Sequence, residues 1–142
     1  MTGPSSEIKI YGRIGVNAPQ PNFMVESVWR GRVFGADWRN AAGGSLDLLE
    51  PATGATLTRV GNAVAEDVRR AAVEACAAQP AWAATPYEKR AAVLRKAARL
   101  LEDHQEELIP WIARETGGIL AKAGFEIHMV TGILYRSSAM CT

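Results

Sequence analysis

The side chains that could perform chemistry in this sequence are few and lie far apart. Neither His104 nor His128 has a second His or Cys three or four residues away, so their spacing gives no metal site. A cysteine nucleophile needs a base held within hydrogen-bond reach, and the sequence shows none beside Cys76 or Cys141. We therefore expect a solvated helix position for His104, a structural role for His128 and two free thiols.

Two glycine pairs and one pair of carboxylates complete the set of candidates. Gly43-Gly44 and Gly117-Gly118 are not phosphate-binding loops, because neither is followed by Lys and Ser or Thr and neither fits Gly-x-Gly-x-x-Gly. We expect a turn at the first pair and a helix end at the second. Glu106 and Glu107 are adjacent, so their carboxylates diverge on a helix instead of pairing. The residues alone predict a soluble α/β or mostly helical domain without a visible active site.

Composition and charge exclude several classes of protein. A chain of 142 residues is long enough for one domain with a modest core. It has 16 Lys plus Arg and 15 Asp plus Glu, and this net charge of +1 gives no reason to expect nucleic acid or a membrane as partner. Two cysteines are too few for a disulfide-framed secreted domain. No apolar run reaches the ~18 residues of a membrane span, and glycines and prolines interrupt any signal peptide, so we expect a cytoplasmic protein.

The first half of the chain is predicted to be extended. Residues 1–26 carry scattered glycines and prolines and are expected to form a flexible N-terminal arm. Residues 27–60 contain β-formers such as Val28 and Trp38, punctuated by glycines. Residues 51–54 are typical of a turn, which predicts a short β-hairpin near residues 46–60.

The second half of the chain has helical periodicity. The first helix is expected to begin at Ala65 and to end at Pro80, with alanines on the face that meets another helix. The second helix begins with a predicted capping box in which Thr85 and Glu88 satisfy each other's backbone N–H groups. An interior proline clashes with the preceding turn, so Pro110 predicts a kink or break near residues 108–109.

The second and third helices each have an apolar stripe. Gly117-Gly118 separates them, and the third helix is expected over residues 119–135, with loss of periodicity afterwards. A helix of this length cannot bury its stripe alone, so a partner surface is needed. The stripe of the second helix consists of Val93, Leu94, Ala97, Leu101, Leu108, Ile109 and Ile112, and that of the third of Leu120, Phe125, Met129, Ile133 and Leu134.

Five segments occur in an order that resembles the amino-terminal part of an aldehyde dehydrogenase. They are Glu50-Pro-Ala-Thr-Gly54, Ala65-Glu-Asp-Val68 with Ala71-Ala-Val73, Trp82 with Pro86 and Arg90, Arg114-Glu-Thr-Gly117, and Lys122. The lead-in Trp29-Arg-Gly-Arg-Val-Phe34 and the run Lys122-Ala-Gly-Phe-Glu-Ile127 resemble those of benzaldehyde dehydrogenases. The chain departs from the family at Val64, where a Ser or Thr usually caps the first helix, and at Pro110.

The resemblance implies an α/β fold that is helix-rich in this part, with a short β-hairpin and about three helices. Residues 27–142 would form an incomplete amino-terminal segment of the region that binds NAD(P) and mediates oligomerisation. The family oxidises aldehydes, here an aromatic one, through a cysteine thioester, with NAD or NADP as cofactor and a glutamate as base. Those catalytic and cofactor-binding positions would lie beyond Thr142, so no catalytic, cofactor or metal residue is assigned within the chain.

Only two site residues carry over from the family. Phe125 and Met129 match positions on a helix that borders the substrate tunnel, although core packing is the alternative. Three readings of the chain remain open. It is a dehydrogenase portion that is inactive alone, or a helical binding module that self-associates or pairs with a separate C-terminal half, or a small enzyme that uses His128 and a cysteine.

Overall fold

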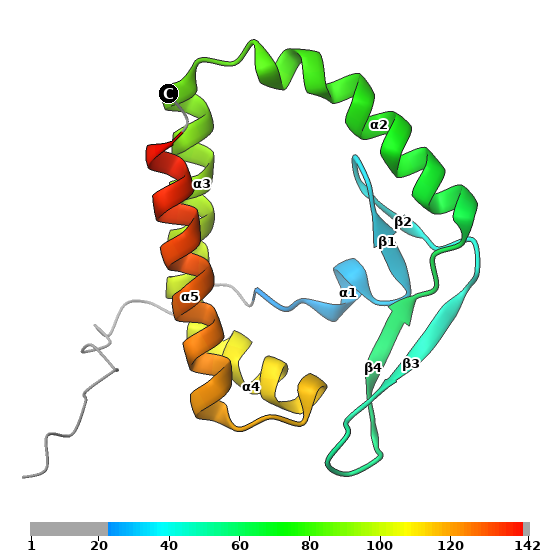
Figure 1. Cartoon of the computed structure of the whole chain (residues 1–142). Helices are drawn as coiled ribbons and strands as arrows, with labels where there is room; N and C mark the ends of the chain where they lie inside the picture. Colours follow the sequence, from blue (N-terminus) through cyan, green and yellow to red (C-terminus); the bar gives the residue numbers. More distant parts are fainter. Residues whose placement is uncertain (1–22, 141–142) are drawn as a thin grey trace, which may run out of the picture.

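The computed structural model describes residues 23–140, which fold into five helices and two pairs of antiparallel strands (Figure 1). We call β1–β4 together with α1 the strand unit, and α3–α5 the helical unit; α2 leads from one to the other (Figure 1). The elements in chain order are α1 (Glu26–Trp29), β1 (Arg32–Phe34), β2 (Trp38–Asn40), β3 (Ser45–Leu49), β4 (Thr56–Gly61), α2 (Ala65–Ala83), α3 (Tyr87–Asp103), α4 (Gln105–Thr116) and α5 (Leu120–Ala139).

The strand unit consists of two hairpins. The predicted hairpin near residues 46–60 is confirmed as β3 and β4, with Ser45 opposite Gly61 and Leu46 opposite Val60. Its turn needs Gly54, whose φ of 72° is unfavourable for other residues. The prediction of extended structure holds for β1 and β2 but is wrong at Val28, which lies in the single helical turn α1. Of the predicted arm of residues 1–26, residues 1–22 lie outside the described part of the chain.

The two hairpins meet where a glycine permits close approach. The backbone N–H of Gly31 donates to the carbonyl of Arg59 at 3.1 Å. A Cβ atom at Gly61 would lie 2.5 Å from the carbonyl oxygen of Arg32, which is closer than packed atoms allow. Gly61 therefore lets β4 lie against β1, and it fixes the position of one hairpin on the other.

The helical unit packs through small side chains. α3 and α5 lie side by side (Figure 1), and their most buried residues include Ala91 and Ala98 on α3 and Ala123 on α5. The predicted stripe of α3 is therefore only partly right, because Val93 is exposed and the alanines lie inside. Alanine removes side-chain bulk between the helices, so their backbones approach closely and no large side chain is fully buried in the described residues.

Pro80 does not end the first long helix. α2 continues to Ala83, and the N–H of Ala84 still donates to the carbonyl of Pro80 at 3.0 Å. A proline in a helix leaves the carbonyl four residues earlier, here that of Cys76, without its partner. The helix is exposed around Cys76, so water can replace that bond and the helix survives.

The prediction for the inner face of α2 is also wrong. Asp67 is the only buried residue of this helix, and its alanines lie at exposed or half-buried positions. The close helix packing that alanines permit occurs between α3 and α5 instead.

The predicted capping box at Thr85 is wrong as well. The hydroxyl of Thr85 donates back to the carbonyl of Ala81 at 2.9 Å, in the last turn of α2. Pro86 takes the cap position of α3, and its carbonyl accepts from the N–H groups of Lys89 and Arg90. A Thr hydroxyl can bond to the turn before it or to the turn after it. Because α2 runs beyond Pro80, the carbonyl of Ala81 lies within reach and accepts the bond from Thr85.

The break expected near residues 108–109 occurs earlier. α3 ends at Asp103 and α4 begins at Gln105, while Pro110 lies inside α4. His104, with φ −108° and ψ 14°, leaves helical geometry between them. The expected second helix is therefore two helices, which together with the extra turn α1 raises the number above the three predicted.

The end of α4 is confirmed and that of α5 is not. The helix end predicted at the glycine pair is confirmed, and Gly117 closes α4 in the left-handed conformation, with φ 70°. α5, expected to end at residue 135, continues to Ala139. Ser138 is buried there and donates its hydroxyl proton to the carbonyl of Tyr135 at 2.7 Å, so this polar residue fits inside the helix pair.

Two carboxylates attach α2 to the strand unit. Asp67 accepts from the backbone N–H groups of Val64 and Ala42 at 3.1 and 3.0 Å, which compensates in part for the missing Ser or Thr cap at Val64. Glu74 accepts from the guanidinium of Arg39, with Nη1 to Oε1 at 2.7 Å, and from the N–H of Ala36 at 3.1 Å. The bond from Arg39 and then that from Ala36 hold the pKa of the Glu74 carboxyl at about 2, below its ordinary 4.5.

Enlarging the side chain at Ala98 should destabilise the helical unit. Ala98 is 0% exposed between α3 and its neighbours, so Ala98→Leu forces the helices apart and should cost about 1–3 kcal/mol. Urea unfolding followed by circular dichroism measures the change. Ala92→Leu adds the same atoms at an exposed position of α3 and should stay within about 0.5 kcal/mol of the wild type. Equal effects of the two variants would contradict the packing described.

Acid should destabilise the attachment of α2. A carboxyl whose pKa is lower in the folded state contributes stability above its ordinary pKa of 4.5, and that contribution is lost as the pH falls towards about 2. We expect the urea midpoint to drop from about pH 5 to about pH 3, and to drop less steeply in Glu74→Gln, which is already weakened at neutral pH. Glu88→Gln, at an exposed position of α3, should keep the wild-type slope. A Glu74→Gln profile parallel to that of the wild type would refute this role.

Candidate functional site

The candidate catalytic side chains do not come together in the structure. Cys76 is a free, exposed thiol on α2, and His128 is exposed on α5. Within residues 23–140, no group of three or more His, Cys, Asp or Glu side chains is placed to hold a metal ion. Cys141 lies outside the part of the chain that the structure describes. The described residues 23–140 therefore offer no thiol paired with a base, and within them the reading as a small cysteine enzyme gains no support.

His104 is not the solvated residue that the sequence predicts. Its side chain is only 10% exposed, and its ring lies 4.9 Å from the ring of Phe23. Its Nδ1 lies 3.7 Å from Oε2 of Glu107. The charged residues around His104 in the sequence suggested solvent, but the segment before α1 folds over this side chain, a long-range contact that no local pattern reveals.

Glu107 joins the helical unit to the segment before α1, and sequence reasoning assigned it no role. Its two oxygens accept the backbone N–H groups of Phe23 at 2.7 Å and Met24 at 2.6 Å. Burial raises the pKa of this carboxyl, but the bonds from Met24 and Phe23 and the nearby His104 lower it more, so that the net pKa lies below its ordinary value. Glu106 is exposed, so the two adjacent carboxylates do diverge as predicted.

Phe125 and Met129 lie on the outer face of α5. Their side chains are 60% and 41% exposed, one helical turn apart, and Ile133 continues the same stripe. The buried face of α5, which includes Ile127 and Thr131, points the other way, towards the rest of the helical unit. In the described chain these two residues are therefore surface residues and not core residues, and a tunnel role for them stays a prediction.

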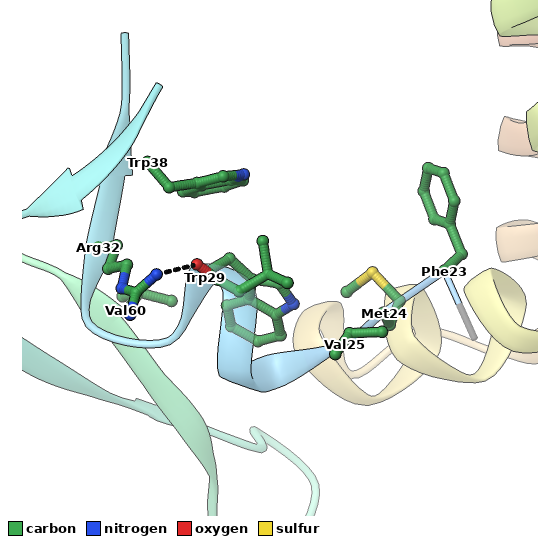
Figure 2. Close-up of a pocket in the computed structure, with 8 residues that line it drawn as sticks. Phe23, Met24, Val25, Trp29, Arg32, Trp38 and Val60 are labelled. Carbon is green, nitrogen blue, oxygen red and sulfur yellow. Dashed lines mark hydrogen bonds between the residues drawn. The ribbon is translucent and has the colours of Figure 1, made fainter. Parts of the chain in front are cut away.

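A hollow of about 530 Å³ lies in the strand unit (Figure 2). One side is formed by residues of and before α1, and the other by β1, β2 and β4. The guanidinium of Arg32 donates to the carbonyl of Val28 at 3.2 Å, so this charge is already engaged with the backbone. The hollow can hold an apolar group but provides no acid or base. It is lined by Phe23, Met24, Val25, Val28, Trp29, Arg32, Trp38 and Val60.

The comparisons with known proteins point to one family. The model described as the aldehyde dehydrogenase family matches residues 38–142. A vanillin dehydrogenase of Amycolatopsis sp. is 45% identical over 119 residues, which cover 84% of this chain and 24% of that protein. An NAD(+) benzaldehyde dehydrogenase of Pseudomonas putida is 39% identical over 117 residues, which cover 82% and 24%.

Solved structures agree with the sequence matches. The crystal structure of an NAD-dependent benzaldehyde dehydrogenase from Corynebacterium glutamicum superposes with a TM-score of 0.76 at 28% identity, over 85% of this chain and 26% of that one. A 3,6-anhydro-L-galactose dehydrogenase in complex with NAP gives a TM-score of 0.72 at 28% identity, over 78% and 23%. The helix-rich α/β arrangement is thus the one found in these dehydrogenases.

The chain spans about a quarter of the length of the relatives it matches. Many large apolar side chains are exposed in the described residues, among them Val68 on α2 and Phe125 on α5. Every helix in residues 23–140 is too short or too polar to span a lipid bilayer. Exposed apolar stripes of this kind are typical of surfaces that pack against another protein segment.

The exposed stripe of α5 should make the isolated chain bind a fluorescent dye for apolar surfaces and associate at high concentration. The double substitution Phe125→Ser and Met129→Ser should reduce dye fluorescence severalfold, because it removes two neighbouring apolar side chains from one face. Dye titration and analytical ultracentrifugation measure both properties. Leu49→Ser, at an exposed position of β3, should change them much less. A wild-type chain that stays monomeric and binds no dye would contradict the expectation.

Proposed function

The chain belongs to the aldehyde dehydrogenase family, and from that membership we propose that it forms the amino-terminal portion of an NAD(P)-dependent dehydrogenase. The proposed reaction oxidises an aromatic aldehyde to its carboxylic acid. The match to residues 38–142 carries the proposal, and two relatives are named for aromatic substrates, vanillin and benzaldehyde. The choice between NAD and NADP follows from residues that we place outside this chain.

Within that enzyme, the role of this chain is to form part of the framework that holds the reacting groups in place. Its described residues offer no thiol beside a base, so we expect the nucleophilic cysteine and the glutamate base from elsewhere in the enzyme. We assign residues 27–142 to an incomplete segment of the NAD(P)-binding and oligomerisation region. A cytoplasmic homo-oligomer is the expected context.

Phe125 and Met129 are the residues through which we expect this chain to touch the substrate path. They form an exposed aromatic and thioether pair on α5, a surface suited to guide a planar apolar molecule. Their exposure in the described chain supports the proposal, because residues that line a path cannot be closed off by neighbouring helices. Both would be catalytically inert, so their effect would fall on binding and not on the chemical step.

A chimera tests the proposed function directly. In the Amycolatopsis vanillin dehydrogenase, the segment that aligns with this chain is replaced by the chain itself, and reduction of NAD is followed with vanillin and with benzaldehyde. We expect turnover by the chimera and none by the isolated 142-residue chain. Turnover by the isolated chain, or a correctly assembled chimera without activity on either aldehyde, would overturn the proposal.

Variants of the chimera test the two tunnel residues in the same assay. Phe125→Ala and Met129→Ala should each raise KM for vanillin about tenfold at nearly unchanged kcat, because each removes apolar contact with the aromatic ring. Val130→Ala lies on another side of α5 and should leave KM unchanged. Unaltered KM in both tunnel variants would remove these residues from the substrate path while the family assignment stands.

A second candidate function is a helical binding module. The exposed stripe of α5 and the exposed Val68, Val73 and Trp82 of α2 favour it, because they leave apolar surface on both sides of the molecule. In this reading the chain self-associates or pairs with a separate C-terminal half. Restoration of dehydrogenase activity when the chain is mixed with the remaining part of the Amycolatopsis enzyme would show that pairing.

A further inference from the structure

The strand unit and the segment before it contact the helical unit at one row of residues, which starts just before α4 and continues along it and which we call the α4 face. Its residues are His104, Glu107, Trp111 and Arg114, and their spacing of three, four and three places them in one row. Each of these four residues contacts at least one residue that precedes Thr53 in the chain. In Figure 1, α1 and the β3–β4 turn both reach towards this part of the helical unit.

The inner half of the α4 face holds residues 23–29, which we call the strap. Glu107 accepts the N–H groups of Phe23 and Met24, one on each carboxylate oxygen, at 2.7 and 2.6 Å. Such bonds are stronger than neutral ones because the acceptor is charged. The ring of Trp29 lies 5.8 Å from that of Trp111 in an edge-to-face arrangement at 80°.

The outer half of the α4 face holds the β3–β4 turn. Nε of Arg114 donates to Oε1 of Glu50 at 2.7 Å, and Thr53 donates its hydroxyl proton to Oε2 of the same carboxylate at 2.7 Å. Beyond the end of α4, a Cβ at Gly117 would lie 3.2 Å from Cβ of Pro51, so helix end and turn are in contact. This second attachment is exposed at Arg114 and therefore screened by water and salt.

Each unit has packing of its own that does not use the α4 face. α5 packs against both α3 and α4, the two hairpins join at β1 and β4, and α1 lies on β1. The covalent connection through α2 adds little packing between the two units, because Asp67 is the only buried residue of that helix. Loss of the α4 face contacts would thus leave both units internally packed.

From these contacts we propose that the α4 face is a releasable attachment between two separately packed units, and that Glu107 is the residue that holds the strap. When the carboxylate no longer accepts both N–H groups, the strap leaves α4 together with the strand unit. The two units then move apart about the connection between α2 and α3. The movement exposes the facing rings of Trp29 and Trp111.

The distance between the units in the full 142-residue chain tests the proposal. Cys76→Ser and Cys141→Ser remove the native thiols, and Leu46→Cys on β3 with Ile133→Cys on α5 provide exposed sites for spin labels. Double electron–electron resonance is recorded on labelled chain diluted with unlabelled chain. Glu107→Gln should raise the ratio of long to short distances about tenfold, as expected for the loss of one charge-assisted hydrogen bond.

Two controls decide the outcome. Glu106→Gln removes the adjacent exposed charge and should keep the wild-type distance distribution. Far-ultraviolet circular dichroism of Glu107→Gln should match that of the wild type, since both units keep their internal packing. Unchanged distances in Glu107→Gln, or the same change in Glu106→Gln, would overturn the proposal. So would a loss of helix that accompanies the distance change, because the units would then unfold as one.

Discussion

Carboxylates that accept hydrogen bonds from distant segments connect elements of this chain that share little apolar contact. Asp67 and Glu74 attach α2 to the strand unit, and Glu50 and Glu107 attach the helical unit to the hairpin turn and to the strap. The need for them follows from the core, in which the described residues bury no large side chain completely. Where apolar burial is small, directional bonds to charged acceptors fix how elements are placed. Each acceptor is ionised at neutral pH, so the arrangement depends on charge as well as on shape.

The helical unit packs chiefly through small side chains and contains one such bond, which the hydroxyl of Tyr135 on α5 donates to Glu102 on α3 at 2.8 Å. Alanines at the contact of α3 and α5 bring the two backbones close together, and Ser138 satisfies its hydroxyl within its own helix. Because small residues form the contact with α3, larger side chains such as Phe125 and Met129 remain exposed on the opposite side of α5. One helix thus combines a tight inner face with an apolar outer face.

The sequence predicted features that depend on local geometry. The hairpin follows from the turn at residues 51–54, and the end of α4 from Gly117, whose conformation few other residues adopt. Pro80 and Pro110 were misleading, because an exposed helix can continue through a proline when water solvates the freed carbonyl. The capping box predicted at Thr85 was wrong because its hydroxyl can bond to either of two neighbouring helices and bonds to α2.

The contacts of the α4 face were beyond prediction from sequence. The bonds of Glu107 span 84 and 83 positions and that of Arg114 to Glu50 spans 64, and no periodic pattern marks a backbone N–H as the partner of a particular carboxylate. For the candidate site, the order of short motifs indicated the family, and the comparisons confirm it. The location of Phe125 and Met129 on one helix face was readable from their spacing, whereas their exposure depended on which face α3 covers.

The bonds of Glu107 to Phe23 and Met24 also set an order of events at the ribosome. They span 84 and 83 positions, so the strap emerges long before its acceptor exists. At roughly 5–20 residues per second, that interval is roughly 4–17 s, far longer than a hairpin needs to form. During translation the strand unit therefore folds with its leading segment unattached, and a chaperone or a neighbouring nascent chain has several seconds in which to bind the aromatic side chains that α4 later covers.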